Sequence, residues 1–70
     1  MITPKEKAEA LYSRIRTSIY YRGYPLEELH KTTKRLCDLI TTEIMISKMV
    51  DLTDEQVIFW RKVQDEIIKL

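Results

Sequence analysis

Apolar residues recur at spacings of three and four along nearly the whole chain, which is the pattern of amphipathic helices. The pattern breaks twice, at residues 23–25 and just before Thr53. It therefore predicts three helices, over about residues 4–22, 25–49 and 54–70, and no strand. Short connections place consecutive helices antiparallel. We predict one all-α domain, residues 1–70, built as a three-helix unit.

The residue types at the predicted helix ends agree with these boundaries. Thr3 and Thr53 are suitable N-cap residues, and Glu6 and Gln56 follow them at the capping-box position. Gly23 suits the left-handed residue that ends many helices. The three helices use nearly every residue, so no long loop is left for a catalytic site.

Each predicted helix has one apolar stripe that is expected to face the core. The stripes contain Ala8, Leu11, Tyr12, Ile15 and Ile19 in the first helix, Leu26, Leu29, Thr33, Leu36, Cys37, Ile40 and Ile44 in the second, and Val57, Trp60, Val63, Ile67 and Leu70 in the third. Further apolar residues lie outside these stripes. A helix that is apolar nearly all round is expected to be buried nearly all round, which three short helices cannot achieve alone.

We predict that another copy of the chain covers this surplus apolar surface. Below about 70–80 residues a single core rarely supplies more than ~3–5 kcal/mol, so self-association would also add stability. The alternatives are a partner protein on the same surface, or a monomer with scattered exposed side chains. The predicted oligomer or partner interface consists of Leu39, Met45, Ile46, Met49, Val50 and Phe59.

The composition excludes several classes of protein. The 70 residues are 44% hydrophobic and include one Gly and two Pro, which is unlike a disordered segment. One cysteine cannot form an internal disulfide framework. No apolar run approaches the roughly 18–20 residues of a membrane span, and no signal peptide is visible. We expect a cytoplasmic protein that does not contact a membrane.

Catalytic chemistry finds little support in the sequence. The only histidine, His30, lies in a polar helical stretch without neighbouring metal ligands. Cys37 lies on the apolar stripe and is expected to be a small buried side chain. A single glycine excludes a glycine-rich phosphate loop. We therefore predict a non-enzyme with no cofactor and no metal.

Charge is distributed unevenly along the chain. Residues 1–35 contain eight Lys or Arg and four Glu, a net charge of +4, whereas residues 36–70 contain four Lys or Arg and seven Asp or Glu, a net charge of −3. The total of +1 does not favour nucleic-acid binding, which depends on neutralising phosphates. The split suits a small anionic ligand, an acidic partner, head-to-tail packing of two copies, or ordinary solvated helix faces.

The stretch from residue 14 to residue 24 is rich in arginine and tyrosine. Arginine grips phosphates with two parallel hydrogen bonds, and tyrosine rings stack on bases. The stretch is therefore a candidate anion or nucleotide site completed by a second chain. A protein interface and a solvated helix end are the alternatives. The candidate ligand-binding residues are Arg14, Arg16, Ser18, Tyr21, Arg22, Lys34 and Arg35.

Three segments resemble a family of short helical proteins of tailed bacteriophages and prophages. They are residues 3–12 (TPKEKAEALY), 37–44 (CDLITTEI) and 59–70 (FWRKVQDEIIKL). The family reads Thr-Pro-Lys-Glu-Lys-Ala at its start, Cys-Ala-Leu-Ile and then Asp-Glu-Ile in its centre, and Tyr-Trp-Gln-Glu-Val-Lys and then Glu-Ile at its end. The three segments cover less than half of the chain, and residues 13–35 depart from the family pattern.

The resemblance implies a phage accessory protein that acts by stoichiometric binding against a host function. Such proteins block a host protein or sequester the nucleotide signals of bacterial immunity. We expect sequestration of a nucleotide immune signal in pockets between subunits, with protein–protein inhibition of a host protein as the alternative. A small DNA-binding regulator is a second alternative, but the low net charge and the long second helix disfavour it.

Overall fold

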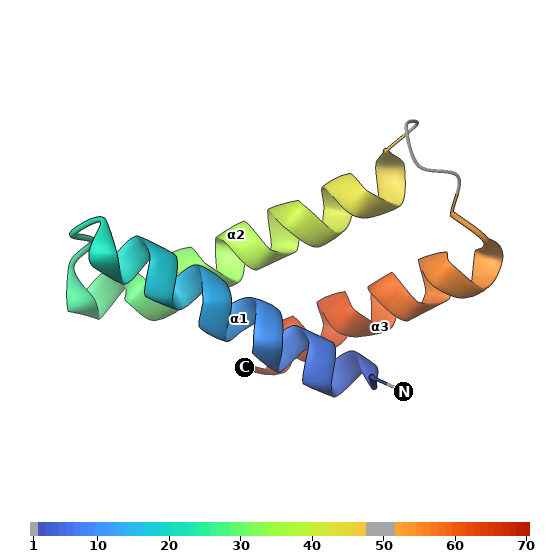
Figure 1. Cartoon of the computed structure of the whole chain (residues 1–70), viewed down its shortest axis with the longest axis horizontal. Coiled ribbons are helices and arrows are strands. Elements are labelled where there is room, and N and C mark those ends of the chain that lie inside the picture. The colour runs from blue at the N-terminus through green and yellow to red at the C-terminus, as the bar shows by residue number, and fades with distance from the viewer. Residues whose placement is uncertain (1, 48–51) are drawn as a thin grey trace.

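The computed structural model describes residues 2–47 and 52–70 and contains three helices, α1 (Pro4–Tyr21), α2 (Leu26–Ile46) and α3 (Asp54–Lys69). The chain reverses direction after α1 and again after α2, so that consecutive helices are antiparallel (Figure 1). Each helix packs against both of the others, and the described residues contain no strand. The predicted all-α three-helix unit is confirmed.

Threonine side chains begin α1 and α3, as the sequence predicts. The Thr53 hydroxyl accepts a hydrogen bond from the Gln56 N–H (3.2 Å), and the Gln56 side chain accepts one from the Thr53 N–H (2.9 Å). This capping box satisfies two backbone donors that the helix itself cannot. At α1 the box is incomplete, because the Glu6 carboxylate accepts from the Thr3 hydroxyl (3.0 Å) rather than from its backbone N–H.

Gly23 ends α1 as predicted, with a left-handed φ of +89°. The N–H of Gly23 donates to the Tyr20 carbonyl (3.1 Å), and the N–H of Tyr24 donates to the Ile19 carbonyl (3.3 Å). These two bonds form a Schellman motif, which satisfies carbonyls at the helix end. The motif turns the chain sharply, and α2 begins only three residues after Gly23.

The predicted end of the second helix at residue 49 is wrong. The helix ends at Ile46, because Ser47 has extended backbone angles (φ −64°, ψ 124°). Serine competes for backbone hydrogen bonds outside a helix, which favours a helix end at this residue. The 21 residues of α2 span about 32 Å, which still makes it the longest of the three helices.

The core lies where the three helices meet. Ala8 from α1, Cys37 from α2, and Val63 and Ile67 from α3 are all fully buried there. Leu29 and Ile19 are buried nearer to the turn that joins α1 and α2. Four residues of the predicted stripes, Leu36, Ile40, Ile44 and Val57, are only half-buried. Two further stripe residues are exposed, because they stand at helix ends with no neighbour to cover them. These are Leu26, which is 71% exposed, and Leu70, which is 40% exposed.

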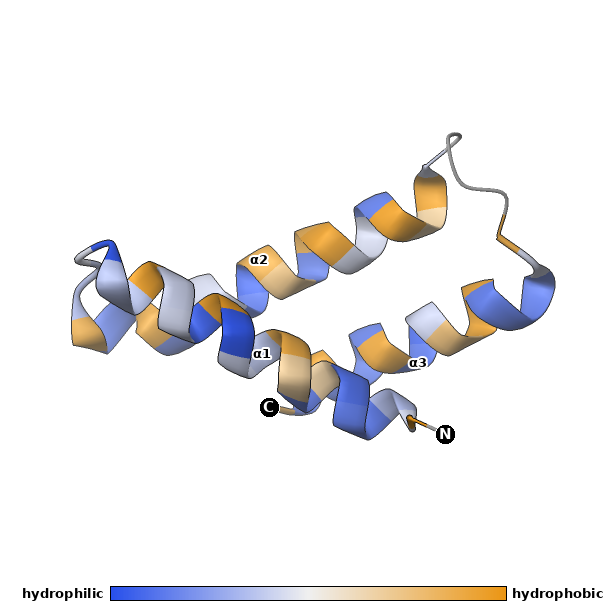
Figure 2. Ribbon diagram, in the orientation of Figure 1, coloured by the Kyte–Doolittle hydropathy of each residue, from blue (hydrophilic) through white to orange (hydrophobic). Residues whose placement is uncertain are grey.

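Apolar side chains remain outside this core, as the sequence predicts. Bands of hydrophobic residues continue along α2 to its last turn (Figure 2). Leu39 and Ile46 on α2 and Ile58 and Ile68 on α3 are each more than half exposed. The described residues thus leave apolar surface uncovered on two helices.

Candidate functional site

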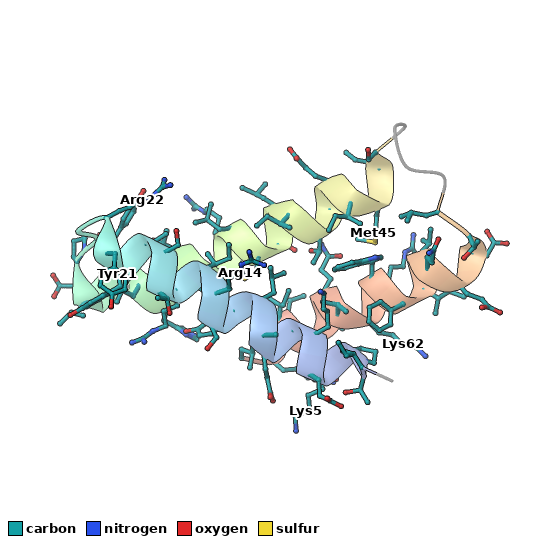
Figure 3. All side chains as sticks on the ribbon, in the orientation of Figure 1. Lys5, Arg14, Tyr21, Arg22, Met45 and Lys62 are labelled. Atoms are coloured by element: carbon teal, nitrogen blue, oxygen red, sulfur yellow. The ribbon has the colours of Figure 1, made fainter. Side chains whose placement is uncertain are left out.

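The turn between α1 and α2 forms one end of the molecule, and two of the seven predicted ligand-binding residues lie at it. Tyr21 is the last residue of α1, and Arg22 is its C-cap. Arg14 lies about two turns earlier on the same helix (Figure 3). We call the exposed cations and tyrosines of this region the basic end. It consists of Arg14, Arg16, Tyr20, Tyr21, Arg22 and Tyr24.

The side chains of the basic end are exposed. Tyr21 is 82% exposed, and its ring meets the ring of Tyr20 edge to face, with 5.6 Å between the centroids. The side chains of Arg14, Arg16 and Arg22 form no hydrogen bond or ion pair with any other described residue. Their charges are therefore available to a ligand, without a competing carboxylate in the part of the chain that the structure describes.

Helix geometry divides these residues between two faces of α1. Arg14, Ser18 and Arg22 follow one another at intervals of four, which places them along one side. Arg16 lies two residues from Arg14, about 200° around the helix, and therefore points elsewhere. The spacing thus places Arg14 and Ser18 on a different side of α1 from Arg16, and at the end of the helix Tyr21 and Arg22 point in different directions (Figure 3).

The Lys34 side chain forms a hydrogen bond to another helix of the same chain. Its Nζ donates a hydrogen bond to the Ile68 carbonyl (2.8 Å) in the last turn of α3. A lysine at this position neutralises the partial negative charge of the helix end and satisfies a carbonyl that lacks a partner within the helix. Lys34 therefore links α2 to α3 and does not reach toward the cations of α1 in this structure.

Arg35 lies in a shallow pocket on α2. The pocket is lined by Glu28, Lys31, Thr32 and Arg35, with no residue from α1. The spacing of three, four and seven residues along one helix is a signal that sequence reasoning could have used to find it. The pocket thus brings Arg35 together with Lys31 and with no cation of α1.

The described residues of the predicted interface differ in their surroundings. Leu39 and Ile46 are exposed on α2, 54% and 70% respectively, whereas Met45 is half-buried and reaches from α2 toward α3 (Figure 3). Phe59 packs against the core from α3 and meets Trp60 edge to face. Met49 and Val50 lie outside the described residues. The apolar surplus is thus spread over more than one face.

The single histidine joins two helices. The Tyr12 hydroxyl and His30 Nδ1 are 2.6 Å apart, and their rings are in contact. The sequence pattern predicts a surface histidine without a partner, whereas the structure places His30 in a hydrogen bond between α1 and α2. A third polar link joins α2 to α3, because the Gln64 amide donates to Asp38 (2.8 Å) and to Thr42 (2.9 Å).

Cys37 is fully buried in the core, as predicted. Burial raises the pKa of its thiol above the ordinary value of 9.0, because the charged thiolate loses its hydration. The thiol therefore remains protonated in the folded protein at neutral pH, where it packs as a small apolar side chain.

The raised pKa of Cys37 predicts a loss of stability in alkaline solution. Below the ordinary pKa of 9.0 the thiol keeps its proton in both states, and its contribution to stability is complete. As the pH rises further, the unfolded chain loses the proton first, and the free energy of unfolding falls. Urea denaturation over an alkaline pH series measures this fall. The Cys37→Ala variant should lose less stability over the same series, and equal slopes for both proteins would contradict the interpretation.

The described residues contain no group of three or more His, Cys, Asp or Glu side chains that could hold a metal ion. None of the described helices is both long enough and apolar enough to cross a membrane. Neither a protein family model, nor a curated protein, nor a solved structure matches the chain.

Proposed function

We propose that the protein is a non-enzymatic binding protein and that its basic end takes an anionic ligand. The carrying observation is that Arg14 and Arg22 are exposed and form no hydrogen bond or ion pair with any described residue. Arginine forms strong, charge-assisted hydrogen bonds with phosphate oxygens. A ligand with phosphate groups would supply the partners that the fold does not.

A nucleotide is the ligand class that suits this composition. Arg14 and Arg22 are separated by eight residues, or about 12 Å along the helix, so a ligand that contacts both is extended and has more than one phosphate. Tyr20, Tyr21 and Tyr24 are 52%, 82% and 44% exposed beside them. Exposed tyrosine rings offer stacking surfaces to bases, whichever base is present.

A second chain would complete the site in the sharper form of this proposal. Within one chain, the pocket that contains Lys31 and Arg35 includes no residue of α1. In this form, Arg35 from α2 of another copy would join the arginines of α1 around the ligand. If the resemblance to the phage family reflects a shared role, the ligand would be a nucleotide signal of host immunity that this protein sequesters.

A groove between α2 and α3 favours protein–protein inhibition as the second candidate. It is lined by Thr42, Met45, Ile46, Val57, Arg61, Gln64 and Asp65. Methionine adapts its shape to different partners and is frequent on binding surfaces. An amphipathic helix of a host protein would fit such a groove, with apolar side chains against Met45, Ile46 and Val57 and polar ones against Arg61, Gln64 and Asp65.

Isothermal titration with a panel of linear and cyclic nucleotides tests the proposed function. We expect saturable heat with at least one nucleotide, and one ligand per two chains if the site is shared. Substituting both Arg14 and Arg22 with glutamine should weaken binding about tenfold or more, because each arginine forms charge-assisted hydrogen bonds with phosphate. Inorganic phosphate alone should bind more weakly, since it offers the tyrosines nothing to stack on.

The matched control substitutes Lys5 and Arg61, two exposed cations outside the basic end, with glutamine. This variant has the same net charge as the arginine variant and should bind as the wild type does. Circular dichroism verifies that both variants are folded. Absence of heat with every nucleotide, or equal weakening by both variants, would contradict the proposal.

A further inference from the structure

Besides the groove between α2 and α3, an apolar surface lies in the part of the molecule away from the basic end. There the first residues of the chain meet the first half of α3 and form a shallow pocket. We call this surface the α1–α3 patch. It is lined by Ile2, Thr3, Pro4, Glu55, Ile58, Phe59 and Lys62.

The centre of the α1–α3 patch is apolar and exposed. Ile2 is 58% exposed and Ile58 is 53% exposed, and both lie beside Pro4 and the half-buried ring of Phe59. Two isoleucines that share one hollow form a continuous apolar surface, which differs from single exposed side chains scattered over a protein. In a chain whose core contains few fully buried apolar residues, covering such a surface adds burial that the fold itself lacks.

The α3 part of the patch has a symmetrical charge pattern. Glu55, Ile58, Phe59 and Lys62 follow at intervals of three, one and three, so they occupy one face of α3. The acid stands three residues before the apolar pair, and the base stands three residues after it. Neither Glu55 nor Lys62 forms a hydrogen bond or an ion pair with another described residue. Both charges are therefore available to a partner.

We propose that the α1–α3 patch is the contact surface of a two-fold symmetric dimer in which the α3 helices of two copies pack antiparallel. A two-fold axis between Ile58 and Phe59 places Glu55 of each copy opposite Lys62 of the other, and Ile58 opposite Phe59. The contact is then apolar at its centre and has an ion pair on each side. A two-fold interface must be complementary to itself, and this charge pattern fulfils that requirement.

This dimer leaves the basic end free. Figure 3 shows Tyr21 and Arg22 at one end of the molecule and Lys62 in the opposite half. The proposed dimer therefore does not depend on the proposed ligand, and each proposal fails or stands by its own variants. If copies also meet through the basic end, the two contacts together give an assembly larger than a dimer.

Sedimentation equilibrium over a concentration series tests the dimer. The wild type should reach about twice the 8.4 kDa of one chain. The Ile58→Glu variant buries a charge in the contact and should remain a monomer at concentrations where the wild type is a dimer. Ile68→Glu is the matched control, because Ile68 is equally apolar and 63% exposed on the same helix but lies outside the patch. It should dimerise as the wild type does.

Charge reversal separates this dimer from any other association. Glu55→Lys alone places two lysines opposite each other on both sides of the axis, and Lys62→Glu alone does the same with two glutamates. Each should weaken dimerisation about tenfold, since two ion pairs are replaced by two repulsions. The double variant Glu55→Lys with Lys62→Glu restores both pairs and should dimerise nearly as the wild type does. A monomeric wild type, or a double variant weaker than the single variants, would overturn the proposal.

Discussion

Replacing Ile67 with alanine should lower the free energy of unfolding by about 2–5 kcal/mol. Ile67 is 1% exposed and belongs to the core cluster in which all three helices meet. The substitution removes buried apolar atoms and leaves a cavity that the neighbouring helices fill only in part. A single core of this size supplies no more than roughly 3–5 kcal/mol, so the variant should be largely unfolded at room temperature. Urea denaturation followed by circular dichroism measures the loss.

The adjacent residue is a matched control for this experiment. Ile68 is 63% exposed, so Ile68→Ala should change the free energy of unfolding by no more than about 0.5 kcal/mol. The Ile68 carbonyl that accepts from Lys34 belongs to the backbone and is retained in the variant. Equal losses in the two variants would mean that α3 does not present the face described here to the core.

Replacing Leu29 with alanine should have an effect of similar size at the end that carries the candidate site. Leu29 is 1% exposed, and Ile19 at the end of α1 is also buried. We expect a loss of about 2–5 kcal/mol, because the removed atoms lie in closely packed surroundings. Thermal and urea denaturation report the loss. If this variant is folded at low temperature, weakened nucleotide binding would show that packing beneath the basic end positions its arginines.

Leu26 is the control for this second prediction. It lies one turn before Leu29 and is 71% exposed, although its position in the sequence pattern assigns it to the same stripe. Leu26→Ala should therefore be nearly neutral, within about 0.5 kcal/mol. A loss as large as that of Leu29→Ala would show that the first turn of α2 is covered, contrary to the structure.

Helix existence and helix starts could be predicted from local chemistry. Thr3, Thr53 and Gly23 act on the backbone within a few residues of themselves, so their roles follow from neighbouring positions alone. The end of α2 was harder, because apolar periodicity continues beyond Ile46 in the sequence while the backbone is already extended at Ser47. Periodicity describes faces of a helix and carries little information about its last residue.

Contacts between helices could not be predicted in the same way. The bond between Tyr12 and His30 and the bond from Lys34 to the end of α3 join residues 18 and 34 positions apart. Such contacts depend on how the helices cross, which spacing within one helix does not specify. The same limitation explains Leu26, since a stripe predicts the direction of a side chain and not whether a neighbour covers it.

The candidate site was predicted in part. The common side of Arg14, Ser18 and Arg22 follows from their spacing of four, and exposure of these residues follows from their polarity. The positions of Lys34 and Arg35 relative to these residues could not be predicted, because they depend on which face α2 turns toward α1. The α1–α3 patch could not be predicted from the sequence for a related reason. Ile2 precedes the first helix, and only the fold places it beside Ile58.

The central claim is that an anionic ligand binds at the basic end, and an NMR titration of isotope-labelled protein with the nucleotide panel tests it most directly. We expect amide shift changes centred on Arg14, Ser18 and Arg22, with the amides of Lys5 and Lys62 unchanged. The changes should be lost in the variant in which glutamine replaces Arg14 and Arg22. Shifts centred on the groove between α2 and α3, or no shifts with any nucleotide, would contradict it.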